Sequence, residues 1–177
     1  MTTYTLMLED TVLPSHIAHR RGVIYHDVVH AWLIERPRTW RDMCAVWSWW
    51  VIAHMADALP DDALAVAARQ SPYIALSRVA HRLRPDVLRA CALAEPATAL
   101  RCAQRYLDDE TTRACALLAP EAGLRFCSHV YSAAELAGAA RAHPIAALTC
   151  ARGELAEELV DELVEEITPT RDNEGAQ

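Results

Sequence analysis

The chain has 177 residues, of which 53% are hydrophobic, a length and composition suited to one domain with a continuous core. Its formal net charge is −7 and all 17 of its basic residues are arginine, which excludes a Schiff-base lysine and a Walker-type phosphate loop. The acidity is concentrated in residues 154–177 and the rest of the chain is nearly balanced, so the composition does not indicate a basic nucleic-acid binder.

Residues 1–58 predict an N-terminal cap that contains one or two degenerate helical repeats. The opening stretch MTTYTLMLEDTVLPSH lacks the basic start and apolar run of a signal peptide. The most apolar window, which begins at Met43, is too short and too interrupted for a membrane span of about 20 residues. We therefore expect a cytoplasmic protein that does not bind membranes.

Two histidines in this region, His26 and His30, are the first candidates for chemistry. At positions i and i+4 they share one helix face, as do the zinc ligands of HExxH metalloproteases. The sequence does not place a third ligand, for which the candidates are His16, His19, Glu35 and His54. We favour the interpretation that the pair are polar residues of a capping helix, and a metal site is the alternative.

Three tryptophans, Trp47, Trp49 and Trp50, gather in the stretch WSWW. The favoured interpretation is structural: their indoles pack beneath residues 1–34. The functional alternative is an aromatic hot spot at one end of the fold, because tryptophan is enriched where partners dock.

Prolines recur every 24 residues along 59–153, at positions 72, 96, 120 and 144. Residues related by this spacing form a column. One column holds Leu76, Leu100, Leu124 and Leu148, and another holds Ala68, Ala92, Ala116 and Ala140. Strict self-similarity at a fixed period is typical of a solenoid, so we predict four 24-residue repeats.

Each repeat predicts two short helices. Acidic residues at the start of the first helix complement its dipole, and the proline begins the second helix, where its missing N–H costs nothing. The first helices are expected at 60–70, 84–94, 108–118 and 132–142, and the second at 72–82, 96–105, 120–130 and 144–152. The leucine columns of both helices should face inward and stack on neighbouring repeats. The first helices carry Leu64, Leu88 and Leu136, and the second helices carry the four leucines that follow the prolines.

The register extends in both directions. Upstream, residues 35–58 read as a degenerate repeat with Ser48 in the proline column. Downstream, ELAEELVDELVEEI (154–167) predicts an amphipathic, acidic capping helix, and 168–177 a flexible tail. One face of this helix should carry Leu155, Leu159, Leu163 and Ile167. The predicted fold is all-α: a single-domain α-solenoid of two-helix repeats between two caps.

The segments LAEPATALRCA and LLAPEAGLRFC resemble the leucine-rich repeat variant family, a 24-residue relative of HEAT-like α-solenoids. Arg101 and Arg125 match the family's arginine, whereas Ser77 and Thr149 do not. The family's type member also has an iron–sulfur segment, which needs clustered cysteines, and residues 1–58 contain only Cys44. The resemblance therefore implies a binding scaffold and no cofactor.

Arginines also recur in columns, including Arg89 with Arg113 and Arg101 with Arg125. Such columns can bind an acidic peptide or a nucleic-acid backbone, and the alternative is ordinary ion pairing between repeats. The six cysteines form no CxxC pair and lie in helical patterns, so we interpret them as reduced core residues.

These patterns favour a non-catalytic protein-binding module. It would be an adaptor, or an inhibitor encoded by a mobile element that occludes a larger complex. The candidate partner-binding residues are Trp47, Trp49, Trp50, Arg89, Arg101, Arg113 and Arg125. Two alternatives stay open: a metal-dependent protein that uses His26 and His30, and a nucleic-acid-backbone binder that uses the arginine columns.

Overall fold

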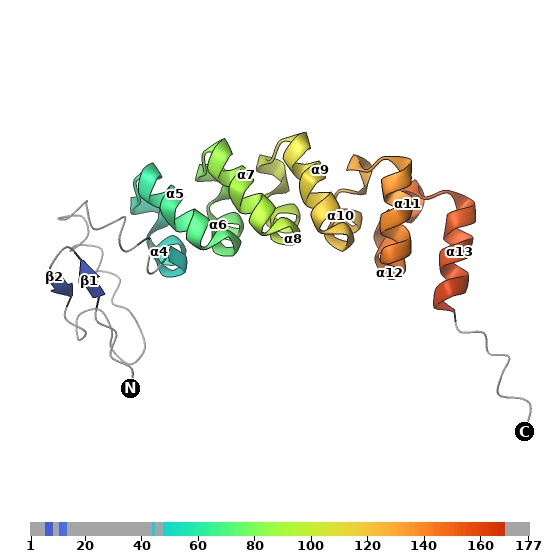
Figure 1. Cartoon of the computed structure of the whole chain (residues 1–177), viewed down its shortest axis with the longest axis horizontal. Coiled ribbons are helices and arrows are strands. Elements are labelled where there is room, and N and C mark those ends of the chain that lie inside the picture. Colours follow the sequence, from blue (N-terminus) through green and yellow to red (C-terminus); the bar gives the residue numbers. More distant parts are fainter. Residues whose placement is uncertain (1–5, 9–10, 14–43, 45–47, 169–177) are drawn as a thin grey trace, which may run out of the picture. The chain divides into compact units, whose positions relative to one another are not determined.

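The computed structural model describes residues 6–8, 11–13, 44 and 48–168 (Figure 1). Residues 48–168 are helical, as predicted, and are joined by short turns. The departure from the predicted all-α class among the described residues is a short antiparallel pair, β1 (Leu6–Leu8) and β2 (Thr11–Leu13). The chain forms two compact units, Met1–Cys91 and Ala92–Gln177, whose boundary falls within one helix, α7 (Pro85–Ala94).

The first unit contains the helices before α7. They are α4 (Ser48–Met55), the 3₁₀ turn η1 (Ala56–Ala58), α5 (Asp61–Gln70), α6 (Pro72–Arg78) and the 3₁₀ turn η2 (Ala80–Arg82). Ser48, in the proline column, is the first described residue of α4. Its Oγ lies 2.6 Å from Oγ of Ser71, the residue that precedes Pro72.

The second unit contains the remaining helices (Figure 1). In chain order they are α8 (Pro96–Thr98), the π-helical η3 (Ala99–Ala103), η4 (Gln104–Tyr106), α9 (Asp109–Leu118), α10 (Pro120–Phe126), η5 (Ser128–Val130), α11 (Ala133–Ala142), α12 (Pro144–Ala146), the π-helical η6 (Ala147–Ala151), η7 (Arg152–Glu154) and α13 (Glu157–Ile167).

The four prolines each begin a helix, which confirms their predicted role. The first helices start one residue later than predicted. The second helices are not continuous, which corrects the predicted 72–82, 96–105, 120–130 and 144–152. Each breaks at the seventh residue after its proline, where φ lies between −118° and −154°, and a 3₁₀ turn follows. The capping helix, predicted from 154, begins at Glu157 because Glu154 belongs to η7.

Each proline leaves one carbonyl of the preceding helix without its helical donor, because residue i+4 has no N–H. The affected residues are Ala68, Ala92, Ala116 and Ala140, all fully buried. The thiols of Cys91 and Cys115 donate to the carbonyls of Ala68 and Ala92 at 3.4 Å. The Ala116 carbonyl accepts from the Tyr131 hydroxyl at 2.7 Å, and the Ala140 carbonyl from the N–H of His143 at 3.3 Å. Each of the four prolines thus leaves one buried acceptor, and each acceptor has a donor.

The predicted leucine columns form the core of each unit. Leu64, Leu76 and Leu88 are buried in the first unit. In the second, Leu100, Leu124 and Leu136 are buried and Leu148 is partly buried. The acidic helix α13 buries Leu159, Val160 and Leu163. Ile167, predicted on the same face, is 42% exposed because it ends the helix beyond these buried turns.

The cysteines only partly follow the prediction that all six lie in the core. Cys44, Cys91, Cys115 and Cys127 are buried free thiols, whereas Cys102 and Cys150 are exposed. These two follow the inward-facing Leu100 and Leu148 by two positions. Two positions correspond to roughly 200° around a helix, which turns the thiols to the outer face.

Candidate groove for a protein partner

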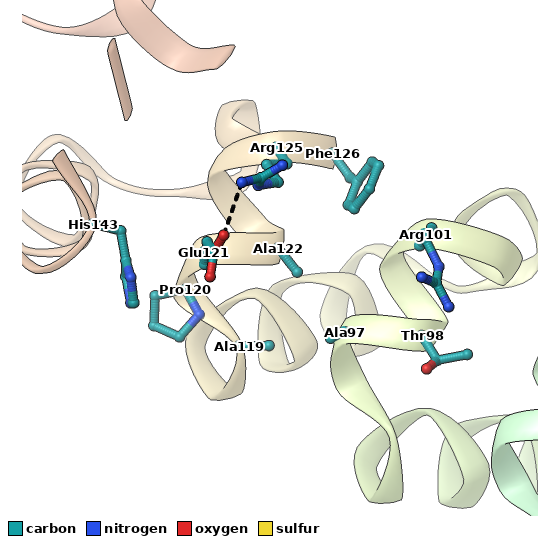
Figure 2. Close-up of a pocket in the computed structure, with 10 residues that line it drawn as sticks. All are labelled: Ala97, Thr98, Arg101, Ala119, Pro120, Glu121, Ala122, Arg125, Phe126 and His143. Carbon is teal, nitrogen blue, oxygen red and sulfur yellow. Dashed lines mark hydrogen bonds and ion pairs between the residues drawn. The ribbon is translucent and has the colours of Figure 1, made fainter. Parts of the chain in front are cut away.

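A surface groove of about 550 Å³ lies in the second unit, between the α8–η3 segment and α10 (Figure 2). From α10, Ala122 and Phe126 project toward the segment that carries Ala97 and Arg101 (Figure 2). The lining residues are Ala97, Thr98, Arg101, Ala119, Pro120, Glu121, Ala122, Arg125, Phe126 and His143. The groove is therefore built by the two segments that begin at Pro96 and Pro120.

The 24-residue spacing of Pro96 and Pro120 explains which side chains line the groove. Pro96 and Pro120 begin the two helices at equivalent positions, and Leu100 and Leu124 are each 1% exposed in the core. Because successive helical residues are about 100° apart, Arg101 and Arg125 turn outward directly after these leucines. Small residues, among them Ala97 and Ala122, leave the space between the helices open.

The groove combines an apolar floor with both signs of charge. Phe126 is 42% exposed. Nη2 of Arg125 donates to Oε1 of Glu121 at 2.9 Å, and each of these two side chains is about half exposed (Figure 2). Arg101 adds a second exposed guanidinium. The arrangement suits recognition of an amphipathic surface, because apolar contact and charge-assisted hydrogen bonds are available side by side.

Arg89 and Arg113, also predicted to bind partners, do not line the groove because they lie on the first helices α7 and α9. Nη2 of Arg113 donates to both carboxylate oxygens of Glu135, at 2.8 and 2.9 Å. Hydrogen bonds from the hydroxyl and N–H of Ser132 lower the pKa of Glu135 to about 2, and the hydrogen bond from Arg113 makes a smaller contribution. Arg113 therefore joins α9 to α11.

Other arginine columns show the same use in ion pairs between helices. Arg69 contacts Asp86 at 3.3 Å in the first unit, and Arg141 contacts Glu162 at 2.9 Å in the second. Arg82 approaches Asp61 at 3.7 Å and donates to the carbonyl of Leu59. These contacts favour the structural interpretation of most arginine columns over a continuous strip that binds a nucleic-acid backbone.

The tryptophans do not share one environment. On α4, Trp49 is 58% exposed and Trp50 is 3% exposed, with the Trp50 ring 5.3 Å from that of His54. Trp47, His26 and His30 lie outside the described residues. The structure therefore supports an accessible position for Trp49 and a core position for Trp50.

Two features of the described residues bear on metal binding and on thiol chemistry. Within 6–8, 11–13, 44 and 48–168, no group of three or more His, Cys, Asp or Glu side chains is placed to hold a metal ion. Burial raises the pKa of Cys91, Cys115 and Cys127 to about 11 and that of Cys44 to about 12. These thiols stay protonated near neutral pH and are therefore poor nucleophiles.

Sequence reasoning identified Arg101 and Arg125 but missed Phe126, Glu121 and His143 as members of the same groove. Phe126 is the only phenylalanine of the chain and shares a column with Arg78, Cys102 and Cys150, all exposed. A single large aromatic residue in an outward column was the available signal.

None of the helices in the described part of the chain has both the length and the apolar character of a membrane span. Comparisons of the chain with protein-family models, curated proteins and solved structures gave no match.

Proposed function

We propose that this chain is an α-solenoid of 24-residue repeats that acts as a non-catalytic protein-binding module, either an adaptor or an inhibitor that occludes a larger complex. The spacing of helix starts supports the architecture. First helices begin at Asp61 and Pro85 in one unit and at Asp109, Ala133 and Glu157 in the other. The likeness to the leucine-rich repeat variant family favours the same arrangement, in which stacked repeats offer extended binding surfaces.

The groove is the observation that supports protein binding most directly. Its Phe126 ring is 42% exposed, although burying a phenylalanine side chain contributes about 1.5–3 kcal/mol of transfer free energy. Aromatic and arginine side chains dominate interface hot spots, and here both occur around one concave surface. A partner that covers Phe126 and contacts Arg101 would bind both the aromatic and the charged side of the groove.

The proposal is tested by affinity capture from the native host with the full-length chain and a groove variant, Phe126→Ala. We expect the wild-type chain to retain a specific partner and the variant to lose about tenfold or more of its affinity, as for a hot-spot aromatic residue. Arg152→Glu is the matched control, because Arg152 is exposed in the same unit and does not line the groove.

Thermal unfolding followed by circular dichroism separates binding from folding in this experiment. Phe126→Ala removes a half-exposed side chain, so its melting temperature should stay close to that of the wild-type chain. A folded variant that captures the same partner with unchanged affinity would contradict binding through the groove.

A further inference from the structure

We infer that the groove between α8–η3 and α10 binds a peptide segment in which carboxylate side chains flank an apolar side chain. This inference rests on the proposed function and specifies its ligand. A groove of about 550 Å³ has room for a few side chains of an extended or helical segment.

The apolar part of the groove provides the contact for the central side chain. Ala97 on α8 and Ala122 on α10 contribute methyl groups, and Phe126 contributes a ring that is 42% exposed (Figure 2). An aliphatic or aromatic side chain placed here would remove apolar surface from water on both partners. This part of the groove selects for hydrophobic character without specifying a sequence.

The charged part of the groove favours carboxylates. Two guanidiniums, of Arg101 and Arg125, and one carboxylate, that of Glu121, line the groove, with Glu121 beside Arg125 and Arg101 on the α8–η3 segment (Figure 2). The Arg125–Glu121 pair is between neighbouring turns of one helix and is half exposed, so it holds Arg125 weakly. A ligand carboxylate that approaches Arg125 can therefore form a bidentate pair with its planar fork.

A protein segment fits this groove better than a nucleic acid. The chain carries a net charge of −7, which repels a polyanion at long range. A short peptide with two or three carboxylates experiences less of this repulsion and also supplies the apolar side chain that Phe126 can cover. Carboxylates on either side of a hydrophobic residue match the order of charged and apolar groups in the groove.

The experiment selects random displayed peptides on the full-length chain and measures the affinities of enriched sequences by fluorescence polarisation. Each synthetic peptide is compared with a counterpart in which Gln replaces Glu and Asn replaces Asp. The groove variants are Arg101→Glu/Arg125→Glu, which reverses the charge, and Arg101→Gln/Arg125→Gln, which removes charge without adding repulsion beside Glu121. Arg152→Glu is the control for net charge.

We expect enriched peptides to carry acidic residues around an apolar residue and to lose about tenfold in affinity in the amide counterpart. The same loss is expected with the Gln variant, whereas Arg152→Glu changes little. Enriched peptides that depend on Phe126 and show no acidic preference would overturn the inference and leave the proposed function standing. If no peptide binding depends on any groove residue, both fail. Tight binding of a single-stranded oligonucleotide that is lost in the Gln variant would also overturn the inference.

Discussion

Two consecutive segments of the second unit, residues 92–115 and 116–139, contain equivalent positions but use different donors for the same buried carbonyl. Each begins with a buried alanine whose carbonyl loses its helical donor to proline. In the first segment the Cys115 thiol donates to the Ala92 carbonyl. In the second the position of that cysteine is Ala139, and the Tyr131 hydroxyl donates to the Ala116 carbonyl instead.

The replacement donor changes its surroundings. Tyr131 occupies the column of Leu107, and its larger side chain crosses the space beside α10. The position equivalent to Ala99 is Gly123, where an added Cβ would lie 2.8 Å from Cζ of Tyr131 and closer still to its hydroxyl oxygen. In this segment the three positions are therefore coupled: Ala139 stands in place of the cysteine, Tyr131 supplies the donor, and Gly123 leaves room for the tyrosine ring.

The largest expected effect comes from breaking this coupling with Gly123→Ala. The new methyl group would displace a Tyr131 ring whose hydroxyl is fixed to the Ala116 carbonyl. Overpacking of this kind costs about 3 kcal/mol, and the better helix propensity of alanine offsets about 1 kcal/mol, so unfolding free energy should fall by about 2 kcal/mol. Urea unfolding followed by circular dichroism measures the change.

Gly138→Ala is the matched control, because nothing lies within 4 Å of a Cβ added at this position of α11. It should raise stability slightly through helix propensity alone. Adding Tyr131→Leu and Ala139→Cys to Gly123→Ala installs the residues of the first segment and should recover most of the loss. Equal effects of Gly123→Ala and Gly138→Ala would contradict the proposed coupling.

The second largest effect is expected from Tyr131→Phe, which keeps the ring and removes the hydroxyl. The buried Ala116 carbonyl then loses its donor, and an unsatisfied buried acceptor lowers the free energy of unfolding by about 1–2 kcal/mol. Denaturant unfolding of this variant is compared with Tyr131→Phe/Ala139→Cys, in which the new thiol should restore part of the stability. If Tyr131→Phe unfolds at the wild-type midpoint, the hydroxyl does not serve as the replacement donor.

The positions that sequence predicted well are those where one residue type is physically required. Proline at a helix start, leucine in the core and alanine at close helix contacts each satisfy a local condition, so they recur at the same spacing. The side-chain donors to the carbonyls of Ala68, Ala92 and Ala116 were not predicted, because they come from other segments of the chain. A column shows that Gly123 and Tyr131 depart from their neighbours, but only the distance between them shows that the two departures belong together.

The candidate site follows the same division. The column of Arg101 and Arg125 was visible in the sequence, and the structure places both around one groove. Arg113 looked equivalent, yet it lies on a first helix and pairs with Glu135. A column specifies which residues share a face, but the packing of neighbouring helices decides whether that face forms a groove or an ion pair.

A third difference between the segments concerns Thr111 and Glu135, which share a column. Thr111 is 1% exposed, and its Oγ1 has no hydrogen-bond partner in the described part of the chain. Thr111→Val replaces this hydroxyl by a methyl group and matches Val87 in the same column. We expect stability to rise by about 1 kcal/mol, since a buried unsatisfied hydroxyl is costly. A lower unfolding midpoint would show that the hydroxyl has a partner.

The smallest effect is expected at Glu135, which takes part in capping α11, whereas the equivalent helix of the first segment, α9, is capped in another way. There, the side chain of Asp108 accepts from the N–H of Thr111 at the start of α9. At the start of α11, Ser132 and Glu135 form a reciprocal capping box, and Arg113 also contacts Glu135. These contacts lower the pKa of Glu135 from 4.5 to about 2.

A depressed carboxyl pKa means that the folded state favours the ionised form. The contribution of Glu135 to stability should therefore be complete above about pH 5 and should disappear as the pH falls toward 2. Glu135→Gln removes the charge at every pH, so the stability difference between wild type and variant should be measurable at pH 7 and should shrink by pH 2.5. Because the carboxylate is still partly exposed to solvent, the difference at pH 7 should be the smallest of the four. If the stability difference between wild type and variant stays constant over this pH range, the capping depends on hydrogen bonds that do not need the charge.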